Sequence, residues 1–434
     1  MIKFIFTKYM LEIMSLKPEG YRPRIIDKRI ADDLALFGAI SIEGPKNCGK
    51  TWTARAVSNS EFQLNANNKV LATTDPSFAL KGDAPHLIDE WQEVPEIWDE
   101  VRFEVDRSAA KGRFVLSASS TLKVGSKMHS GAGRIEQLIM RPMSLFESGD
   151  SDGKVSLSGM FRNEFPSIGP IQQDLKAIIG LTIRGGWPDQ LGFTPEQAMR
   201  KNKDYLRHLC DEDVIRIDGK GRDSRKMMML LRSLARNEST VASNKCIIND
   251  MAEYDNENMA APTYSDYIDV LQRLHIVAPQ DAFSVNIRSS ANVGKNPKRH
   301  LIDPSLSMAA LDMDEESAIK DLNAYGFMFE AMCERDLNIY SMAFDGSVKH
   351  YRDNYGHEID AVVSLGNRWG AFEIKLGTSD IESASNKLVE MKNKILETGK
   401  SAPPEFLCVI SGMSSSAYMR PDGVYVVPIT MLGP

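Results

Sequence analysis

Short apolar runs that alternate with amphipathic stretches fill the first third of the chain. Residues 39–43 (AISIE) form such a run before a glycine-rich turn, and residues 51–58 have the apolar spacing of a helix. Further strands are expected at residues 61–64, 86–88, 114–117 and 137–140, with helical stretches between several of them. Strands that alternate with helices predict a mostly parallel sheet that is covered on both faces. The sequence therefore predicts an α/β unit, which ends near Ser148.

The pattern becomes mainly helical after residues 149–158 (GDSDGKVSLS), a polar, turn-rich stretch that is typical of a linker. Apolar residues recur at helix spacing in three segments, at residues 204–217, 225–236 and 263–274. The short runs at 275–278 and 282–287 then predict two strands of a small hairpin or wing. This region is interpreted either as a winged-helix module or as a helical spacer.

The last third of the chain predicts a second α/β unit. Helices are expected at residues 326–337 and 381–397, and strands at 359–364, 370–374, 406–410 and 424–428. Because 434 residues are too many for one ordinary core, several domains are expected. We divide the chain into an N-terminal extension (1–20), a first α/β domain (21–150), a helical middle region (151–300) and a second α/β domain (301–434).

Composition indicates the cellular compartment of the protein more clearly than it indicates its binding partners. The formal charge of −7 does not favour a general attraction to nucleic acid, although a local basic face could still bind it. The five cysteines are scattered without a C-x-x-C pair, which fits a reducing cytoplasm rather than a zinc site or a disulfide framework. Charges interrupt the apolar start at residues 1–14, which disfavours a secretory signal and leaves Met14 as an alternative start. No later segment approaches the ~20 apolar residues that cross a bilayer, so we expect a cytoplasmic protein.

A phosphate-binding loop follows the first predicted strand. The pattern G-x-x-x-x-G-K-[ST] is met at every fixed position by Gly44, Pro45, Lys46, Asn47, Cys48, Gly49, Lys50 and Thr51. Glycines let such a loop wrap closely around phosphate oxygens with its backbone N–H groups pointing inward. The helix after the loop directs the positive end of its dipole at the same anion. Lys50 is expected to reach the β- and γ-phosphates of ATP, and the Thr51 hydroxyl to ligate Mg²⁺.

An apolar strand that ends in Asp89 and Glu90 supplies the second half of this site. We expect this strand to lie beside the strand of the phosphate loop in a parallel sheet. Asp89 would then hold Mg²⁺ through water. Glu90 would polarise the water that attacks the γ-phosphate, acting with Lys50 in catalysis.

Two further positions are candidates for sensing the phosphate. The strand at 114–117 ends in small polar residues, and in an AAA-type ATPase Ser119 or Ser120 would contact the γ-phosphate or the attacking water. A plain turn from strand to loop is the alternative. Arg134 is interpreted as a phosphate sensor in its own chain, as an arginine finger for a neighbouring subunit, or as an ordinary surface arginine.

A second candidate site lies near the C-terminus. Asp360 stands on one predicted strand and Glu373-Ile374-Lys375 on the next, about a dozen residues later, which is the spacing of PD-(D/E)XK nucleases. Carboxylates on neighbouring strands can hold one or two divalent ions against a scissile phosphate. Strand alternation places Glu373 and Lys375 on one face, where the ammonium could activate water. Glu330, on the preceding helix, is placed to add a third metal ligand.

Taken together, these segments resemble a widespread prokaryotic family of AAA-like ATPases that are fused to a C-terminal domain of uncertain function. The resemblance covers nearly the whole chain from about Tyr21. It rests on the order of seven stretches: LIDEWQEVP (87–95), GRIEQLIMRPMSLFE (133–147), RGGWP (184–188), YIDVLQRLHIV (267–277), GFMFE (326–330), HYRDNYGHEIDA (350–361) and AFEIK (371–375). It implies an AAA-type core, a winged-helix-like middle and a restriction-endonuclease-like C-terminal fold. The family's usual Thr-Gly-Ser after the fourth strand is Ser117-Ala118-Ser119 here, which leaves the sensor assignment open.

Three functions are compatible with these motifs. In the first, ATP hydrolysis drives a switch or motor that changes how the C-terminal module engages double-stranded DNA or a protein partner. In the second, the ATPase gates a nuclease with Asp360, Glu373 and Lys375 as catalysts. In the third, the chain is a nucleotide-dependent interaction protein whose C-terminal site does not turn over. The expected cofactors are ATP and Mg²⁺, with a second divalent ion at the C-terminal site, and a homo-oligomer is left open.

Two smaller features complete the sequence picture. The basic run at residues 295–300 (KNPKRH) is interpreted as a solvated loop or, beside the wing, as a contact to DNA phosphates. His275 lies in an apolar stretch and is interpreted as a packed residue rather than a ligand.

Overall fold

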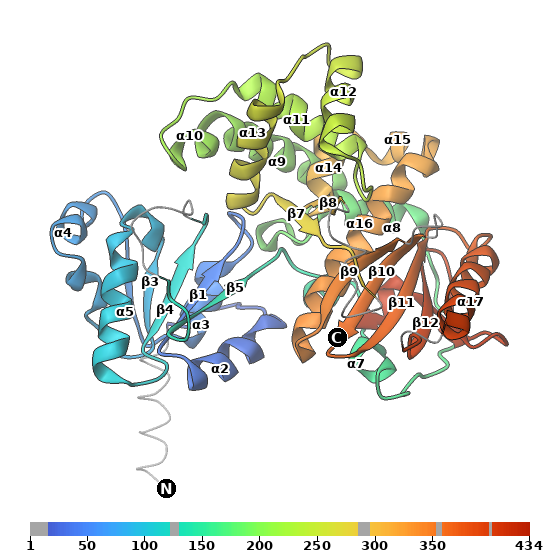
Figure 1. Ribbon diagram of the computed structural model, residues 1–434, viewed down its shortest axis with the longest axis horizontal. Helices are drawn as coiled ribbons and strands as arrows, with labels where there is room; N and C mark the ends of the chain where they lie inside the picture. Colours follow the sequence, from blue (N-terminus) through green and yellow to red (C-terminus); the bar gives the residue numbers. More distant parts are fainter. Residues whose placement is uncertain (1–15, 122–129, 285–295, 353–357, 399–401) are drawn as a thin grey trace, which may run out of the picture. The chain divides into compact units, whose positions relative to one another are not determined.

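The protein forms two compact units in the computed structural model, which describes residues 16–121, 130–284, 296–352, 358–398 and 402–434 (Figure 1). The first unit comprises the described residues up to Arg141 together with Arg273–His275. The second unit comprises the described residues of 142–272 and 276–434. The predictions about residues 1–14 lie outside the described residues. The boundary predicted at residue 300 falls inside the second unit and stays a prediction.

The first unit is built on a parallel five-stranded sheet, as predicted. The strands follow the order β2-β3-β4-β1-β5, with the bounds β1 Ala39–Glu43, β2 Ser60–Gln63, β3 His86–Asp89, β4 Phe114–Ala118 and β5 Ile135–Ile139. The helices of this unit are α2 Ile26–Leu36, α3 Lys50–Val57, α4 Lys69–Thr74 and α5 Glu96–Ser108. All residues of β1 and β4 are buried, as expected for the central strands of a sheet that is covered on both faces.

One expectation about this sheet is wrong. The strand that ends in Asp89 does not lie beside the strand of the phosphate loop, because β4 is inserted between β3 and β1. β4 pairs with β1 on one side, with Ile42 opposite Ser117, and with β3 on the other, with Asp89 opposite Ser117. The carboxyl ends of the three strands therefore still meet at one edge of the sheet.

The core of the first unit lies between the sheet and α5. Ile97, Trp98 and Val101 from α5 pack with Ile88 and Leu116 from the strands. The rings of Trp91 and Trp98 are tilted against each other with their centroids 4.9 Å apart. The aromatic packing fixes the turn that follows Asp89 and Glu90, which supports the site described below.

The second unit begins with short elements and a bundle of helices. Its helices before the last sheet are α6 Leu145–Ser148, α7 Leu157–Met160, α8 Leu175–Arg184, α9 Pro195–His208, α10 Val214–Arg216, α11 Ser224–Arg236, α12 Asn244–Tyr254, α13 Ala261–Arg273, α14 Pro304–Ala310 and α15 Glu315–Lys320. Only the last residue of α13, Arg273, is grouped with the first unit. The helical character predicted for residues 204–274 is confirmed.

The interpretation of residues 149–158 as a linker is wrong. Val155 and Leu157 are fully buried, and β6 (Val155–Ser156) pairs in parallel with β15 (Leu432–Gly433). The Ser156 hydroxyl also donates a hydrogen bond to the Pro434 carbonyl oxygen at 2.6 Å. The polar composition of this stretch reflects its turns, while its few apolar side chains anchor it in the second unit.

The predicted wing has a different second strand. β7 (Val277–Gln280) pairs antiparallel with β8 (Lys298–Leu301), with Val277 opposite Leu301. Residues 281–284 are not part of a strand, and the rest of the predicted strand lies outside the described residues. The basic run therefore does not form a solvated loop where it is described: Lys298 and His300 are buried, and Arg299 donates to the Ala242 carbonyl. Strand alternation turns Lys298 and His300 to the same side.

A mixed six-stranded sheet completes the second unit. Its order is β13-β14-β12-β11-β10-β9, and its strands are β9 Ser347–Arg352, β10 Glu358–Leu365, β11 Arg368–Lys375, β12 Phe406–Ser411, β13 Tyr418–Met419 and β14 Val424–Pro428. β9 was not predicted from the sequence. The helices α16 (Leu322–Ser341) and α17 (Ile381–Thr398) belong to this part of the chain, and Ala384, Leu388 and Met391 of α17 pack on the sheet.

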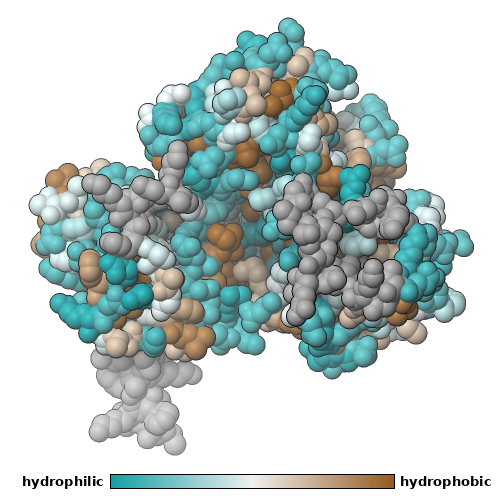
Figure 2. All heavy atoms as spheres, in the orientation of Figure 1, coloured by the Kyte–Doolittle hydropathy of each residue, from teal (hydrophilic) through white to brown (hydrophobic). Residues whose placement is uncertain are grey.

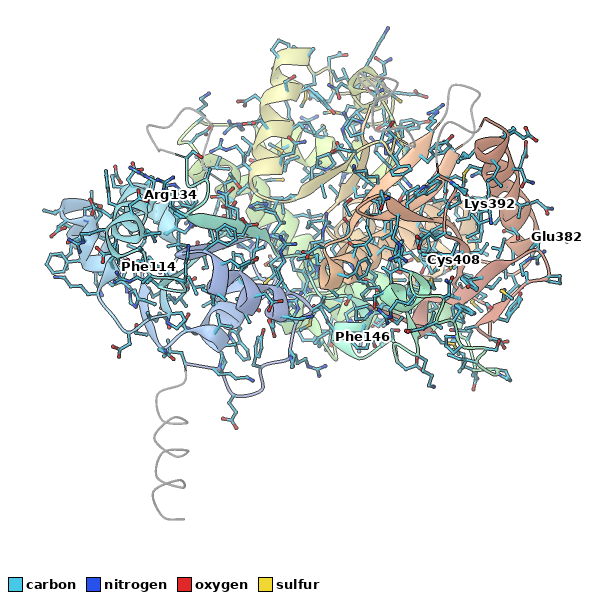
Figure 3. The ribbon with its side chains drawn as sticks, turned by 60° about the horizontal axis from the view of Figure 1, so that its bottom comes forward. Phe114, Arg134, Phe146, Glu382, Lys392 and Cys408 are labelled. Carbon is cyan, nitrogen blue, oxygen red and sulfur yellow. The ribbon has the colours of Figure 1, made fainter. Side chains whose placement is uncertain are left out.

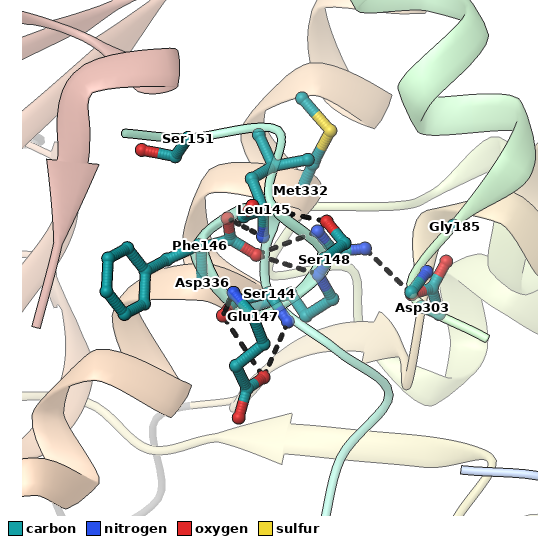
Figure 4. A network of polar contacts seen from close by, with 12 residues as sticks. Ser144, Leu145, Phe146, Glu147, Ser148, Ser151, Gly185, Asp303, Met332 and Asp336 are labelled. Carbon is teal, nitrogen blue, oxygen red and sulfur yellow. Dashed lines mark hydrogen bonds and ion pairs between the residues drawn. The ribbon is translucent and has the colours of Figure 1, made fainter. Parts of the chain in front are cut away.

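Two of the stretches that carry the family resemblance, 133–147 and 184–188, meet in one buried polar network (Figure 4). Asp336 of α16 accepts a hydrogen bond from the backbone N–H of Leu145 at 3.0 Å and so caps α6. The neighbouring Arg335 pairs with Asp336 and, at 2.8 Å, with Asp303, which accepts from the Gly186 N–H at 3.0 Å. A Cβ on Gly186 would lie 1.9 Å from the Met143 carbonyl oxygen, so only glycine fits there. These motifs are therefore explained by packing within the second unit.

The surface agrees with the polar composition. No helix in the described ranges is long and apolar enough to cross a membrane. Hydrophilic side chains cover most of the face drawn in Figure 2.

Candidate nucleotide site and a second charged cluster

The phosphate loop connects β1 to α3 at the carboxyl edge of the first sheet. Asn47 and Gly49 have positive φ values of 65° and 104°, which turn the backbone sharply in front of the helix. A Cβ on Gly44 would lie 2.2 Å from the Met140 carbonyl oxygen, so the loop also needs glycine to pass this neighbour. The Lys50 ammonium is buried and donates to the Pro45 carbonyl oxygen at 2.8 Å. The loop thus has the shape and the positive charge that a phosphate chain requires.

Thr51 and Asp89 meet, as the magnesium assignment requires. The Thr51 hydroxyl lies 3.2 and 3.3 Å from the two carboxylate oxygens of Asp89. The Ser117 hydroxyl, on the inserted strand β4, donates to the same carboxylate. Burial raises the pKa of Asp89, and the hydrogen bonds from Ser117 and Thr51 oppose that shift. A hydroxyl and a carboxylate are oxygen ligands of the kind that Mg²⁺ prefers, so the residues fit this ion.

Glu90 and Ser119 are a second pair of side chains that contact each other at this site. The Ser119 hydroxyl donates to a Glu90 carboxylate oxygen at 3.0 Å, and the Gln92 amide donates to the Ser119 oxygen at 3.1 Å. Glu90 has a φ of 57°, in the left-handed region, and begins the turn that leads to the packed Trp91. Of the two candidate sensor residues, Ser119 is therefore the one whose hydroxyl contacts Glu90.

Arg24 is a contributor that the sequence did not reveal. Its guanidinium donates to the carbonyl oxygens of Cys48 at 2.9 Å and of Arg141 at 2.8 Å. These bonds tie the phosphate loop to the segment that follows β5. Nearby, the Tyr21 hydroxyl lies 3.1 Å from the Thr53 hydroxyl on α3. Both residues precede the loop by at least twenty positions, and no motif in a single sequence links them to it.

A buried polar group lies beside the first residue of the loop. Thr121 donates to the Glu43 carboxylate at 2.6 Å, and its hydroxyl lies 3.3 Å from Nε2 of His275. Burial lowers the pKa of His275 to about 4, helped by the charges of Lys50 and Arg141, so the imidazole is neutral at pH 7. His275 is thus a packed side chain, as the sequence indicated.

Arg134 lies at the wrong end of the sheet to sense a phosphate in its own chain. It precedes the first residue of β5, which pairs with Ala39 at the start of β1, whereas the phosphate loop follows the end of β1. Figure 3 labels Arg134 together with Phe114, the first residue of β4. The guanidinium is half-exposed and pairs with Asp106 at 2.7 Å. The expected role within the chain is therefore corrected, and a role in a neighbouring subunit stays a prediction.

The three residues of the second candidate site are brought together on β10 and β11. The Lys375 ammonium lies 3.3 Å from the Asp360 carboxylate and 3.1 Å from that of Glu373. The Ile374 N–H donates to Asp360 at 2.8 Å. A second ammonium, that of Lys387 on α17, lies 2.7 Å from Glu373. The structure thus brings the three predicted residues close together, whereas the sequence gave no sign of Lys387.

Glu330 lies in an adjoining cluster of buried charges. It pairs with Lys298 of β8, whose ammonium also pairs with Glu334 one turn later on α16. Nε2 of His300 lies 2.9 Å from Glu334, and its Nδ1 lies 3.0 Å from Glu238. Burial raises the pKa of Glu330, and the charge of Lys298 opposes that shift. Glu334 and Glu238 raise the pKa of His300 to about 9 against the effect of burial.

The residues of the second site do not fit the metal centre that the resemblance implies. Within the described ranges, no group of three or more His, Cys, Asp or Glu side chains is arranged to hold a metal ion. Each of the three expected ligands is instead paired with lysine: Glu330 with Lys298, Asp360 with Lys375, and Glu373 with Lys375 and Lys387. The expectation of a metal bound by Glu330, Asp360 and Glu373 is therefore not met.

Comparison with family models finds three matches along the chain. Residues 37–148 match the model of an AAA domain. Residues 175–317 and 325–432 match models of two domains of unknown function, DUF8612 and DUF4143. The AAA match suggests ATP binding and hydrolysis and in general implies Mg²⁺. None of these three models is described as a nuclease or a winged helix, so those two folds stay predictions.

Two curated proteins and two solved structures are similar to the chain. The uncharacterized proteins Rv2008c of Mycobacterium tuberculosis and Mb2031c of Mycobacterium bovis are each 26% identical over 349 residues, which cover 77% of this chain and 70% of theirs. The Walker-type ATPase PABY2304 of Pyrococcus abyssi is 12% identical, with a TM-score of 0.43 over 68% of this chain and 97% of its own. A signal transduction ATPase with numerous domains from Pyrococcus horikoshii is 10% identical, with a TM-score of 0.22 over 89% of this chain and 57% of its own.

Proposed function

We propose that the protein is a Mg²⁺-dependent ATPase whose first unit hydrolyses ATP at the carboxyl edge of the parallel sheet. The observation that carries this proposal is the meeting of Thr51 with Asp89 and of Ser119 with Glu90 beside the phosphate loop. These four side chains come from α3 and from the ends of β3 and β4. Their convergence at one loop is what phosphoryl transfer to water needs, because catalysis there consists mostly of positioning and charge stabilisation.

Each residue then has a distinct role. Bound ATP supplies the phosphoanhydride bond, and Mg²⁺ would be held by the Thr51 hydroxyl and, through water, by Asp89. The Lys50 ammonium leaves the Pro45 carbonyl oxygen to pair with phosphate oxygens. Glu90 orients the attacking water, and Ser119 holds the Glu90 carboxylate in place through its 3.0 Å hydrogen bond. Arg24 holds the phosphate loop in place through its hydrogen bonds to the carbonyl oxygens of Cys48 and Arg141.

The test is Mg²⁺-ATP turnover by the wild-type protein and by Lys50→Ala, with and without double-stranded DNA. We expect turnover that disappears in Lys50→Ala, by about 100-fold or more, because a charge-stabilising donor is lost. The exposed Lys111→Ala, in the first unit but outside the phosphate loop, is the matched control and should retain most of the turnover. ATP binding without turnover in the wild type would contradict the proposal.

The second part of the proposal concerns the process to which ATP hydrolysis is coupled. We propose that nucleotide turnover changes how the C-terminal module engages double-stranded DNA or a protein partner. The chain's net charge of −7 favours a local contact over a general affinity for nucleic acid. Stimulation of turnover by DNA in the experiment above supports the DNA partner, whereas turnover that ignores DNA favours a protein.

A second candidate function, a nucleotide-dependent interaction protein whose C-terminal site does not turn over, is favoured by the pairing of Asp360 and Glu373 with lysines. Cleavage of plasmid DNA with Mg²⁺ or Mn²⁺, lost in Asp360→Asn but kept in the exposed Asp380→Asn, would contradict it and favour an ATP-gated nuclease. Intact plasmid at every nucleotide condition would support it, because the C-terminal site would then show no nuclease turnover.

A further inference from the structure

Oxygen atoms surround the Lys298 ammonium. It contacts the carboxylates of Glu330 and Glu334, and it donates to the backbone carbonyl oxygen of Asp360 at 3.2 Å. The side chain is only 2% exposed. Two carboxylates and a carbonyl around a single buried cation are the oxygen ligands that a hard divalent ion such as Mn²⁺, Mg²⁺ or Ca²⁺ takes in proteins.

The burial of Lys298 is informative because removing its ammonium from water costs free energy. Removing an ammonium from water costs several kcal/mol, and attraction to well-placed carboxylates is what compensates it. An ammonium has three N–H donors, which matches the three oxygens around Lys298. The neighbouring carboxylates are compensated in the same way, Glu334 by His300 and Asp360 by Lys375. A divalent ion cannot share the point at which Lys298 lies.

We propose that Lys298 is a built-in cation that takes the place of a divalent metal ion in the C-terminal module. The module is then independent of divalent cations, and it gains a cation site only when the ammonium is removed. The ligands of that site are Glu330, Glu334 and the carbonyl oxygen of Asp360. The proposal concerns the second unit alone, so it stands or fails separately from ATP hydrolysis in the first.

The first test measures Mn²⁺ binding to the full chain without nucleotide, by electron paramagnetic resonance and calorimetry. All variants carry Asp89→Asn, so that the first unit contributes no site. We expect Lys298→Ala to bind one Mn²⁺ per chain at least about tenfold more tightly than the protein with Lys298. The gain should disappear in Lys298→Ala/Glu330→Gln. Lys298→Arg, which keeps the positive charge, should bind no better than the protein with Lys298.

The second test measures the unfolding temperature, and it can be applied even when Lys298→Ala is less stable than the wild type. Removing Lys298 leaves buried carboxylates without their counter-ion, so the unfolding temperature should fall. Mn²⁺ should raise the unfolding temperature of Lys298→Ala, because an ion that binds only the native state stabilises it, and should leave the protein with Lys298 unchanged. Equal responses to Mn²⁺ with and without Lys298 in both tests would overturn the proposal. So would a Mn²⁺ site in the wild type that Glu330→Gln abolishes.

Discussion

Two groups of carboxylates, one in each unit, differ in the kind of partner that they have. Asp89 and Glu90 accept from hydroxyls, those of Thr51, Ser117 and Ser119. The carboxylates of the second unit, among them Glu334 and Glu373, face ammonium and imidazole groups instead. Hydroxyl partners are neutral, so a carboxylate in the first unit keeps a negative charge that a bound cation can neutralise. Ammonium and protonated imidazole groups already neutralise the charge of the carboxylates in the second unit. Residue type and strand position alone do not separate these two cases.

The largest expected effect concerns the stability that each kind of carboxylate contributes. Ion pairing lowers the pKa of Glu334 to about 2 despite its burial, so its charged form is stabilised by folding. Glu334→Gln should therefore lower the free energy of unfolding of the second unit by about 3–5 kcal/mol. Asp89→Asn should leave the first unit equally stable or slightly more stable, because burial raises the pKa of Asp89 and disfavours its charge.

Scanning calorimetry, which can resolve the transitions of two units, provides this measurement. Glu316→Gln is the matched control, because Glu316 is exposed and pairs with the surface residue Lys320. It should change stability by less than about 1 kcal/mol. A loss in Asp89→Asn as large as that in Glu334→Gln would remove the difference between the two groups.

The next effect is on catalysis and belongs to the first group alone. Glu90→Gln keeps the shape of the side chain and removes its charge, so ATP should still bind while turnover falls by about 100- to 1,000-fold. Turnover and the binding of a fluorescent ATP analogue are measured side by side. Glu93→Gln, an exposed carboxylate in the same turn that pairs with Lys69, should keep wild-type turnover. Undiminished turnover in Glu90→Gln would remove Glu90 from the mechanism.

A smaller effect is expected on the pH dependence of stability. The pKa of His300 rises from the ordinary 6.5 to about 9 in the folded protein. A raised pKa means that the stabilisation is complete below about pH 6.5 and is lost as the pH rises through about 9. The unfolding free energy should thus fall by roughly 1–3 kcal/mol over that interval. His300→Gln should flatten this part of the profile, as followed by thermal unfolding, and an unchanged slope would show that His300 does not carry the charge.

The smallest effect is expected for Arg134. Because its side chain lies at the edge of the sheet away from the phosphate loop, Arg134→Ala should change the turnover of an isolated chain by less than about twofold. Turnover is measured over a range of protein concentrations. A loss that grows with concentration would instead identify Arg134 as a residue that acts on a neighbouring subunit.

The sequence predicted those parts of the sites that are local along the chain. Residues 44–51 and the pair Asp89–Glu90 are contiguous motifs, and Asp360 meets Lys375 because β10 and β11 are neighbouring antiparallel strands. The insertion of β4 between β3 and β1 was missed, since order within a parallel sheet depends on crossovers that leave no periodic signal. The partners Arg24 and Lys298 were missed because they reach their sites from distant segments. Only the alternation of Lys298 and His300 within the basic run hinted at a buried strand.

The pairing of β6 with β15 has a consequence for how the protein is made. Val155 and Ser156 emerge from the ribosome early, yet their strand partners are Leu432 and Gly433. At about 5–20 residues per second, synthesis of the intervening chain takes roughly 15 seconds to one minute. The parallel sheet of the first unit can close in that time, while the start of the second unit waits with apolar side chains uncovered. Newly made chains should therefore depend on chaperones chiefly during the translation of their second half.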